Sequence, residues 1–111
     1  MWIDLCLVTG EINPFSIPVR PFKPDVLIND GDVLTFGNTT VKCVSSPGHT
    51  DGVMSFFFDV TDGVKTYRAG MFGGAGTNTL PKDFIEKNNL TYDHRQKFLD
   101  SIERLEKLPV D

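Results

Sequence analysis

The residue in this sequence best suited to chemistry is His49, which lies in the segment Pro47–Gly52 between two β-rich runs. A histidine at the end of a strand is held by a rigid element, and the neighbouring glycines let the backbone bend closely. Such a position suits a metal ligand, and we expect Thr50 or Asp51 to orient the imidazole by accepting its second N–H. A zinc ion takes about four ligands, so a lone histidine in a turn is also compatible with a merely hydrogen-bonded or exposed residue.

The other residues that bear chemistry have simpler interpretations. Cys6 and Cys43 are too few and too far apart for a disulfide framework, and we interpret both as small buried residues. Together with His49 and His94 they show no zinc-finger spacing. His94 lies in the first turn of a predicted helix, where it is expected to pair with the preceding aspartate or with solvent. The glycine-rich run 73–77 lacks the Lys-Ser/Thr that a phosphate-binding loop requires.

The elements that must position His49 are predicted strands. The runs 33–36 and 39–46 flank Gly37-Asn38, which predicts a hairpin because glycine readily supplies the positive φ of a tight turn. Asp30 and Asp32 flank a glycine just before this hairpin, so we interpret them as turn formers rather than as a catalytic carboxylate pair.

A second hairpin is predicted beyond the loop. The runs 53–60 and 64–69 flank Asp62-Gly63, another turn signal. Three consecutive phenylalanines, at positions 56–58, suggest a strand that is covered on both faces.

Two helices are expected after a glycine-rich loop at residues 70–79. Residues 79–87 predict a short helix with Pro81 in its first turn. Residues 91–107 predict a longer helix with an apolar stripe of Phe98, Ile102 and Leu105. On its solvent-exposed side we predict three i, i+4 ion pairs in which the acidic residue comes first: Asp93/Lys97, Asp100/Arg104 and Glu103/Lys107.

The two ends of the sequence predict extended structure. Residues 1–8 alternate weakly and fit a strand, whereas four prolines within residues 9–24 favour an extended connection. Residues 109–111 have the character of the beginning of a further strand. Strands followed by a terminal helix predict an α+β class, and 111 residues suit one small domain.

Composition excludes several classes of function. The hydrophobic content of 40% is ordinary for a globular chain, and nine phenylalanines indicate a real core. A net charge of −4 gives no electrostatic reason to expect a nucleic-acid partner. No apolar run of about 18 residues exists, so no membrane span is expected. Residues 1–8 lack the basic segment of a signal peptide, and no feature assigns a compartment.

The pattern as a whole resembles the metallo-β-lactamase superfamily over residues 24–111. In that family a "dGD…lG" hairpin precedes a "PGHTxG" loop, and a later helix reads "dyrrsf…l…lPcD". The residues that carry this likeness are Asp30-Gly31-Asp32-x-Leu34-x-Phe36-Gly37, Val41-x-Cys43, Ser46-Pro47-Gly48-His49-Thr50-x-Gly52-x-x-Ser55-Phe56, Lys65-Thr66-Tyr67, Tyr92-Asp93-His94-Arg95 and Leu108-Pro109-Val110-Asp111. The tail is most similar to the branch whose zinc ligands are histidines and one aspartate, without cysteine.

The resemblance implies part of an αββα sandwich: one mostly antiparallel sheet with one long and one short helix. It implies two zinc ions in the intact parent, with His49 as a ligand of the first. The family's HxHxDH string is absent from this sequence, and the last histidine of the family's ligand set has no counterpart. Residues 1–111 are therefore interpreted as a single incomplete domain, the C-terminal half of the fold, which binds zinc weakly or not at all.

The expected function is that of a fragment of a zinc-dependent hydrolase that cleaves an amide, lactam or ester bond of a small molecule with metal-activated water. The fragment itself is expected to be inactive. Gly70 or Met71 stands where many relatives place a metal-binding or polar residue, which suggests an altered second site. Two alternatives stay open: a non-catalytic module that forms a homodimer to cover exposed sheet, and a thioesterase or lactonase relative.

Overall fold

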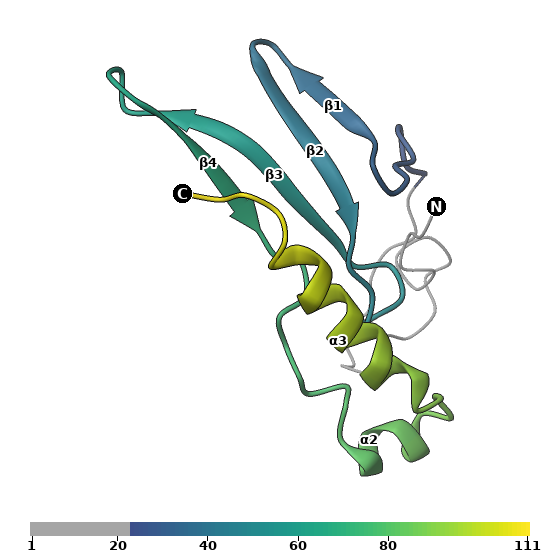
Figure 1. The fold of residues 1–111 in the computed structure, drawn as a ribbon. Coiled ribbons are helices and arrows are strands. Elements are labelled where there is room, and N and C mark those ends of the chain that lie inside the picture. Colours follow the sequence, from purple (N-terminus) through teal and green to yellow (C-terminus); the bar gives the residue numbers. More distant parts are fainter. Residues whose placement is uncertain (1–22) are drawn as a thin grey trace.

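The computed structural model describes residues 23–111. The strand predicted for residues 1–8, Cys6 and most of the proline-rich connection lie outside the described residues. Four strands form one antiparallel sheet in the order β1-β2-β3-β4, as Figure 1 shows. Their bounds are β1 Val33–Phe36, β2 Thr39–Ser45, β3 Met54–Thr61 and β4 Thr66–Met71. Two helices follow, α2 Lys82–Lys87 and α3 Asp93–Leu105.

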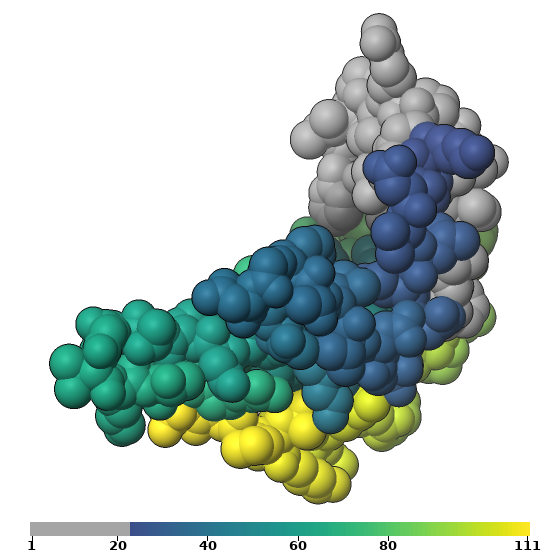
Figure 2. Space-filling view, turned by 90° about the horizontal axis from the view of Figure 1, so that it is seen from above, coloured from purple at the N-terminus to yellow at the C-terminus, as the bar shows by residue number. Residues whose placement is uncertain are grey.

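Both predicted hairpins are present. Phe36 pairs with Thr39 around Gly37, whose φ is +60°, so the positive φ expected at this turn is confirmed. The second hairpin joins β3 to β4 through residues 62–65, where the Asp62 carboxylate accepts hydrogen bonds from the N–H groups of Val64 and Lys65 at 2.8 Å each. The tip of this hairpin extends well beyond α3 (Figures 1 and 2).

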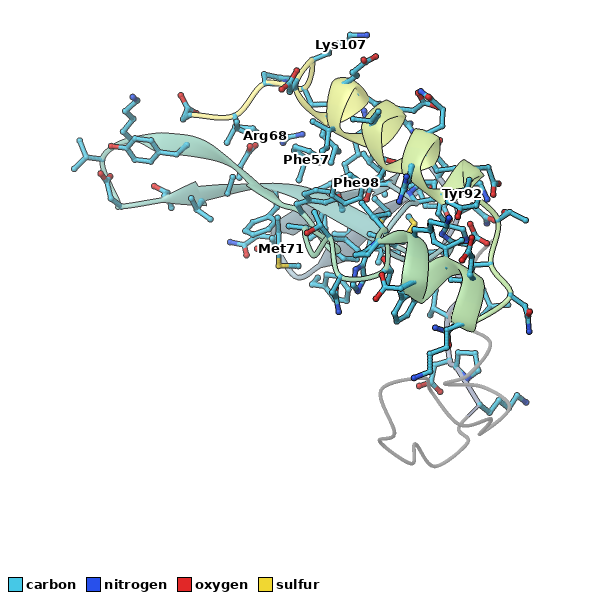
Figure 3. The ribbon with its side chains drawn as sticks, turned by 90° about the horizontal axis from the view of Figure 1, so that it is seen from below. Phe57, Arg68, Met71, Tyr92, Phe98 and Lys107 are labelled. Carbon is cyan, nitrogen blue, oxygen red and sulfur yellow. The ribbon has the colours of Figure 1, made fainter. Side chains whose placement is uncertain are left out.

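The sheet presents one face to α3 and another away from it. Alternation along β3 directs Ser55 and Phe57 toward the helix, where both are buried. Phe56 and Phe58 point to the opposite face and are half-buried. The strand is therefore only partly covered on its second face, less than the run of three phenylalanines predicts. In Figure 3, Met71 lies on the other side of the sheet from Phe57.

The helices begin slightly later than the sequence predicts. Pro81 immediately precedes α2, which buries Ile85 completely. The longer helix α3 runs across one face of the sheet (Figure 1) and buries His94, Phe98 and Ser101. Phe98 belongs to the predicted apolar stripe, and His94 and Ser101 lie on the same face of the helix, four residues before it and three after it. The buried face of α3 therefore contains polar residues as well as apolar ones.

The C-terminal tail lies along the outer edge of β4. The backbone N–H of Asp111 donates to the Arg68 carbonyl at 3.0 Å, and the Arg68 N–H donates to the Asp111 carboxylate at 2.7 Å. Residues 109–111 thus approach the sheet edge as the beginning of a strand would, although no strand is formed there. Within residues 23–111, neither helix has the length and apolar character needed to cross a bilayer.

Candidate functional site

The candidate site is the loop of residues 47–52, which joins β2 to β3. At its base the Ser46 N–H donates to the Val53 carbonyl at 2.9 Å, and inside it the Gly48 N–H donates to the Thr50 carbonyl at 3.1 Å. His49 is half-buried at the tip of this tight turn. The predicted placement of the histidine at the end of a strand is therefore confirmed.

The imidazole of His49 is oriented by a backbone carbonyl from a distant segment. Its Nδ1 lies 2.8 Å from the carbonyl oxygen of Gly76. A carbonyl oxygen only accepts, so Nδ1 carries the proton and the lone pair remains on Nε2. The expectation that Thr50 or Asp51 would accept this N–H is wrong, because the Gly76 carbonyl accepts it, whereas the Asp51 carboxylate binds the Lys97 ammonium.

The glycine-rich loop after β4 forms the wall behind this imidazole. A Cβ added at Gly74 would lie 3.1 Å from the Cβ of His49, and one added at Gly76 would lie 3.2 Å from its Cε1. Both positions are tight for a side chain, so glycine there favours the close approach of the loop backbone to His49. Sequence reasoning identified the loop but missed its role; the signal was the run of glycines at 73, 74 and 76.

Polar side chains of α3 hold the backbone of the same loop. Ser101 donates its hydroxyl to the Pro47 carbonyl at 2.7 Å, and His94 Nδ1 lies 3.3 Å from the Gly48 carbonyl. The Lys97 ammonium lies 2.8 Å from the Asp51 carboxylate and 3.1 Å from that of Asp93. His94 is thus a buried anchor of the loop backbone.

Contact between the loop and α3 extends to their backbones. Gly48 has a φ of +141°, and a Cβ at this position would collide with the backbone of Phe98. The ring of Phe98 also packs against Phe72, with 6.2 Å between ring centroids. Glycine at position 48 therefore serves both the turn and the close approach of the helix.

An ion pair joins α3 to the turn before β1. Arg104 donates to the Asp30 carboxylate at 2.9 Å and to the Ser45 carbonyl at 3.1 Å, while the Ser45 N–H donates to Asp30 at 2.8 Å. The hydrogen bond from Arg104 lowers the pKa of Asp30 below its ordinary value. The predicted Asp100/Arg104 pair is wrong, because Arg104 reaches Asp30 and Asp100 accepts from Gln96 instead.

The Asp93/Lys97 pair is confirmed, and the Lys97 ammonium is shared with the loop. Hydrogen bonds raise the pKa of Lys97, the one to Asp51 most and the one to Asp93 next, so this side chain stays charged. Its hydrogen bond likewise lowers the pKa of Asp93.

Both histidines have Nδ1 near a backbone carbonyl oxygen, but His49 is half-buried whereas His94 is buried, so His49 is the better candidate for a metal ligand. Its Nδ1 is bound to a carbonyl and its Nε2 is free, the arrangement usual for ligating histidines. His94 is buried and turned toward Gly48, and Cys43 is fully buried, which raises the pKa of its thiol. No group of three or more His, Cys, Asp or Glu residues that could hold a metal occurs in the described part of the chain.

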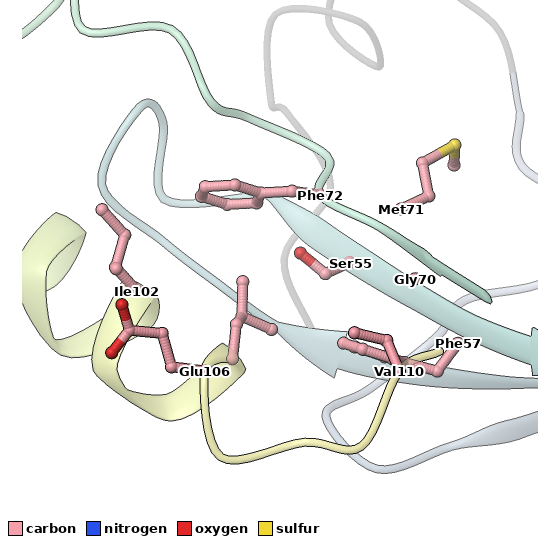
Figure 4. Close-up of a pocket in the computed structure, with 9 residues that line it drawn as sticks. Ser55, Phe57, Gly70, Met71, Phe72, Ile102, Glu106 and Val110 are labelled. Carbon is pink, nitrogen blue, oxygen red and sulfur yellow. The ribbon is translucent and has the colours of Figure 1, made fainter. Parts of the chain in front are cut away.

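An open groove of about 280 Å³ lies elsewhere, between the sheet, α3 and the C-terminal tail (Figure 4). Its lining is mainly apolar and includes Phe57, Phe72, Ile102, Leu105 and Val110. Neither His49 nor any other residue of the loop at 47–52 lines it, so it is separate from the candidate ligand.

Comparison with solved structures defines the class of fold. A β-lactamase from Chitinophaga pinensis matches with a TM-score of 0.74 and 26% identity, over 96% of this chain and 42% of that chain. The metallo-β-lactamase FEZ-1 from Legionella gormanii matches with a TM-score of 0.79 and 24% identity, over the same shares. A class B3 di-zinc metallo-β-lactamase, LRA-12 from an Alaskan soil metagenome, matches with a TM-score of 0.72 and 21% identity, over 96% and 42%. The architecture is therefore a part of the metallo-β-lactamase fold.

The chain is identified as a part of this fold, and the expected α+β class and superfamily resemblance are confirmed. It spans about two fifths of the length of the solved structures that it matches. A hydroxyacylglutathione hydrolase from Francisella philomiragia is 42% identical over 38 residues, 34% of this chain and 15% of that enzyme. No family model matches the sequence.

Proposed function

We propose that this chain is the C-terminal half of a zinc-dependent, metallo-β-lactamase-like hydrolase, in which His49 supplies one ligand to the metal centre. The observation that carries the proposal is the His49 imidazole, whose Nδ1 is bound to the Gly76 carbonyl while Nε2 has no hydrogen-bond partner among residues 23–111. The likeness to metallo-β-lactamases over 96% of the chain supports the same assignment.

The residues of this chain present and shield the ligand. The loop at 47–52 holds His49 at a strand end, the glycines at 74 and 76 fix its ring, and α3 fixes the loop backbone from the other side. When bound, zinc in such a centre supplies a Lewis acid and an activated water for cleaving an acyl bond. The substrate class is an amide, lactam or ester; a thioester or lactone is the alternative.

One histidine provides about a quarter of the ligands that zinc requires. The remaining ligands would have to come from a complementary part of the parent fold, because the described residues contain no further metal-binding group. We therefore expect residues 1–111 alone to bind divalent metal weakly, at His49, and to hydrolyse neither a β-lactam nor a thioester measurably.

The binding test uses Co²⁺, whose paramagnetism broadens nearby proton resonances. The chain contains only two histidines, so their imidazole signals are easily separated. We expect the His49 signals to broaden at lower Co²⁺ concentration than those of His94, and His49→Asn to abolish the response. Preferential broadening of His94, or none at millimolar Co²⁺, would contradict the proposed ligand role.

The activity test measures turnover of a chromogenic cephalosporin and of a glutathione thioester by the purified chain, with and without zinc. We expect both rates to equal those of buffer with zinc. Turnover that a chelator removes and that survives in the His49→Asn variant would overturn both the assignment of His49 and the expected inactivity of the fragment.

A second candidate function is self-association as a non-catalytic module. The sheet face opposite α3 carries exposed apolar side chains: Phe36 is 64%, Met71 53% and Val60 42% exposed. A homodimer that buries this face would remove these side chains from water. Light scattering distinguishes the candidates: a dimer that Met71→Lys dissociates supports self-association, and a concentration-independent monomer excludes it.

A further inference from the structure

We propose that Lys97 is a positioning residue for His49: through Asp51 it holds the loop so that the imidazole meets Gly76 with Nδ1 and presents Nε2 outward. The inference rests on the proposed function for its consequence, metal binding, but its structural part concerns only the orientation of one ring. The two residues of this ion pair are far apart in the sequence: Lys97 lies in α3, and Asp51 lies two residues after the candidate ligand.

The two halves of the loop are held in different ways. The first half is anchored through its carbonyls, at Pro47 by Ser101 and at Gly48 by His94. The second half is residues 50–52. Within the described part of the chain, only two hydrogen bonds hold it. In one, the Gly48 N–H donates to the Thr50 carbonyl; in the other, the Lys97 ammonium donates to the Asp51 carboxylate. Lys97 is therefore the side chain that ties the far arm of the turn to the helix.

His49 lies between these two anchored halves. Its backbone position is fixed from the α3 side, and its ring is fixed by Gly76 on the other side. The Gly76 carbonyl accepts from Nδ1 at 2.8 Å only while the loop keeps its distance from residues 73–76. Release of the far arm lets the turn move, and a movement of about 0.8 Å takes a contact of this length out of hydrogen-bond range.

The Lys97 ammonium also occupies a carboxylate that would otherwise compete for the ring. Asp51 is the residue that local spacing predicts as the acceptor of the second N–H of His49. The structure directs its carboxylate to Lys97 at 2.8 Å, and Asp93 holds the same ammonium at 3.1 Å from within the helix. Without the ammonium, Asp51 becomes free to accept from the imidazole or to bind metal itself.

The effect should be local rather than global. The side chains of Lys97 and Asp51 are 38% and 44% exposed, and ion pairs with this exposure contribute little to overall stability. Removing the pair therefore leaves the fold intact while it alters the orientation of His49. This separates a positioning role from a purely structural one.

The test reads the tautomer of His49 directly. In the 111-residue chain labelled with ¹⁵N-histidine, the imidazole ¹⁵N shifts report which nitrogen carries the proton. The spectra of all variants are recorded at the same mildly alkaline pH. His49→Asn assigns the two rings, and the variants compared are Lys97→Met, which keeps the apolar stem, and Lys97→Arg, which keeps the charge.

The matched control is Lys107→Met in the turn just after α3. Lys107 makes no side-chain ion pair or hydrogen bond within the described residues, and its side chain points away from the sheet (Figure 3). We expect wild type, Lys107→Met and Lys97→Arg to show the Nδ1–H form of His49. Lys97→Met should show a mixture of both tautomers and need about twice as much Co²⁺ or more for the same broadening, because only the fraction of molecules with Nε2 presented binds the metal in this way.

The outcomes separate this inference from the function it builds on. An unchanged His49 tautomer and Co²⁺ response in a folded Lys97→Met variant would overturn the positioning role. The Lys97→Met variant could show a changed His49 tautomer while the wild-type protein shows no Co²⁺ response. That result supports the positioning role of Lys97 but refutes the proposal that His49 is a metal ligand. If Lys97→Met does not fold, Asp51→Asn removes the same ion pair from the loop side. The His49 tautomer in that variant then tests the positioning role.

Discussion

Replacing Gly48 by alanine adds one methyl group at the closest contact between the loop and α3. Gly48 has a φ of +141°, where residues with a side chain are strained. The new Cβ would collide with the Cα of Phe98 and would lie 2.6 Å from its Cβ and 2.7 Å from its backbone nitrogen. These are mostly backbone atoms of a helix, which do not turn aside as a flexible side chain does.

Two costs then act together on the folded state. The backbone conformation costs about 1–3 kcal/mol for a residue other than glycine. Overpacking in a closely packed region costs about 1–3 kcal/mol more. We therefore expect Gly48→Ala to lower the free energy of unfolding by about 4 kcal/mol, a large part of the stability of a small domain.

Urea unfolding followed by circular dichroism measures this loss, and Gly63→Ala is the matched control. Gly63 also has a positive φ, +92°, but a Cβ there has no neighbour within 4 Å. Its replacement should cost only the conformational part, about 1–2 kcal/mol. If the two variants lose equal stability within about 0.5 kcal/mol, a typical limit for comparing distant sites, α3 does not pack on the loop as described.

Two further predictions concern acid stability and thiol protection. The Arg104 hydrogen bond holds the pKa of Asp30 below its unfolded value of about 3.9, so the pair stabilises the fold above that pH and is lost as pH falls through the folded pKa. Asp30→Asn should thus cost about 1 kcal/mol or less near neutrality, since both side chains are 47% exposed, and less at low pH than at pH 7. Thermal unfolding at pH 7 and at acid pH checks this, and an equal loss at both would contradict it. Cys43 is fully buried and its thiol pKa is raised by that burial, so in a Cys6→Ser background it should react with a thiol reagent at least about tenfold more slowly in buffer than in urea. Equal rates in the two solvents would show that Cys43 is accessible in the folded chain.

The local features of this protein could be predicted from its residues alone. Turn residues at Gly37 and Gly63 located both hairpins, because glycine meets a positive φ within a few residues of the strands it joins. Apolar periodicity located α3 to within two residues at each end. The same reasoning placed His49 at a strand end, and the motif around it indicated the superfamily. Each of these inferences depends on neighbours in the chain.

The partners of His49 were decided only by the tertiary structure. Gly76 lies 27 residues from the histidine whose ring it orients, and local spacing pointed instead to Asp51. Asp51 pairs with Lys97, 46 residues away, because α3 packs on the loop and brings an ammonium within reach. Sequence periodicity identifies the apolar face that a helix buries, but which polar groups then meet depends on where the helix crosses the sheet. The sequence therefore named the candidate ligand, whereas packing determined which of its two nitrogens is free.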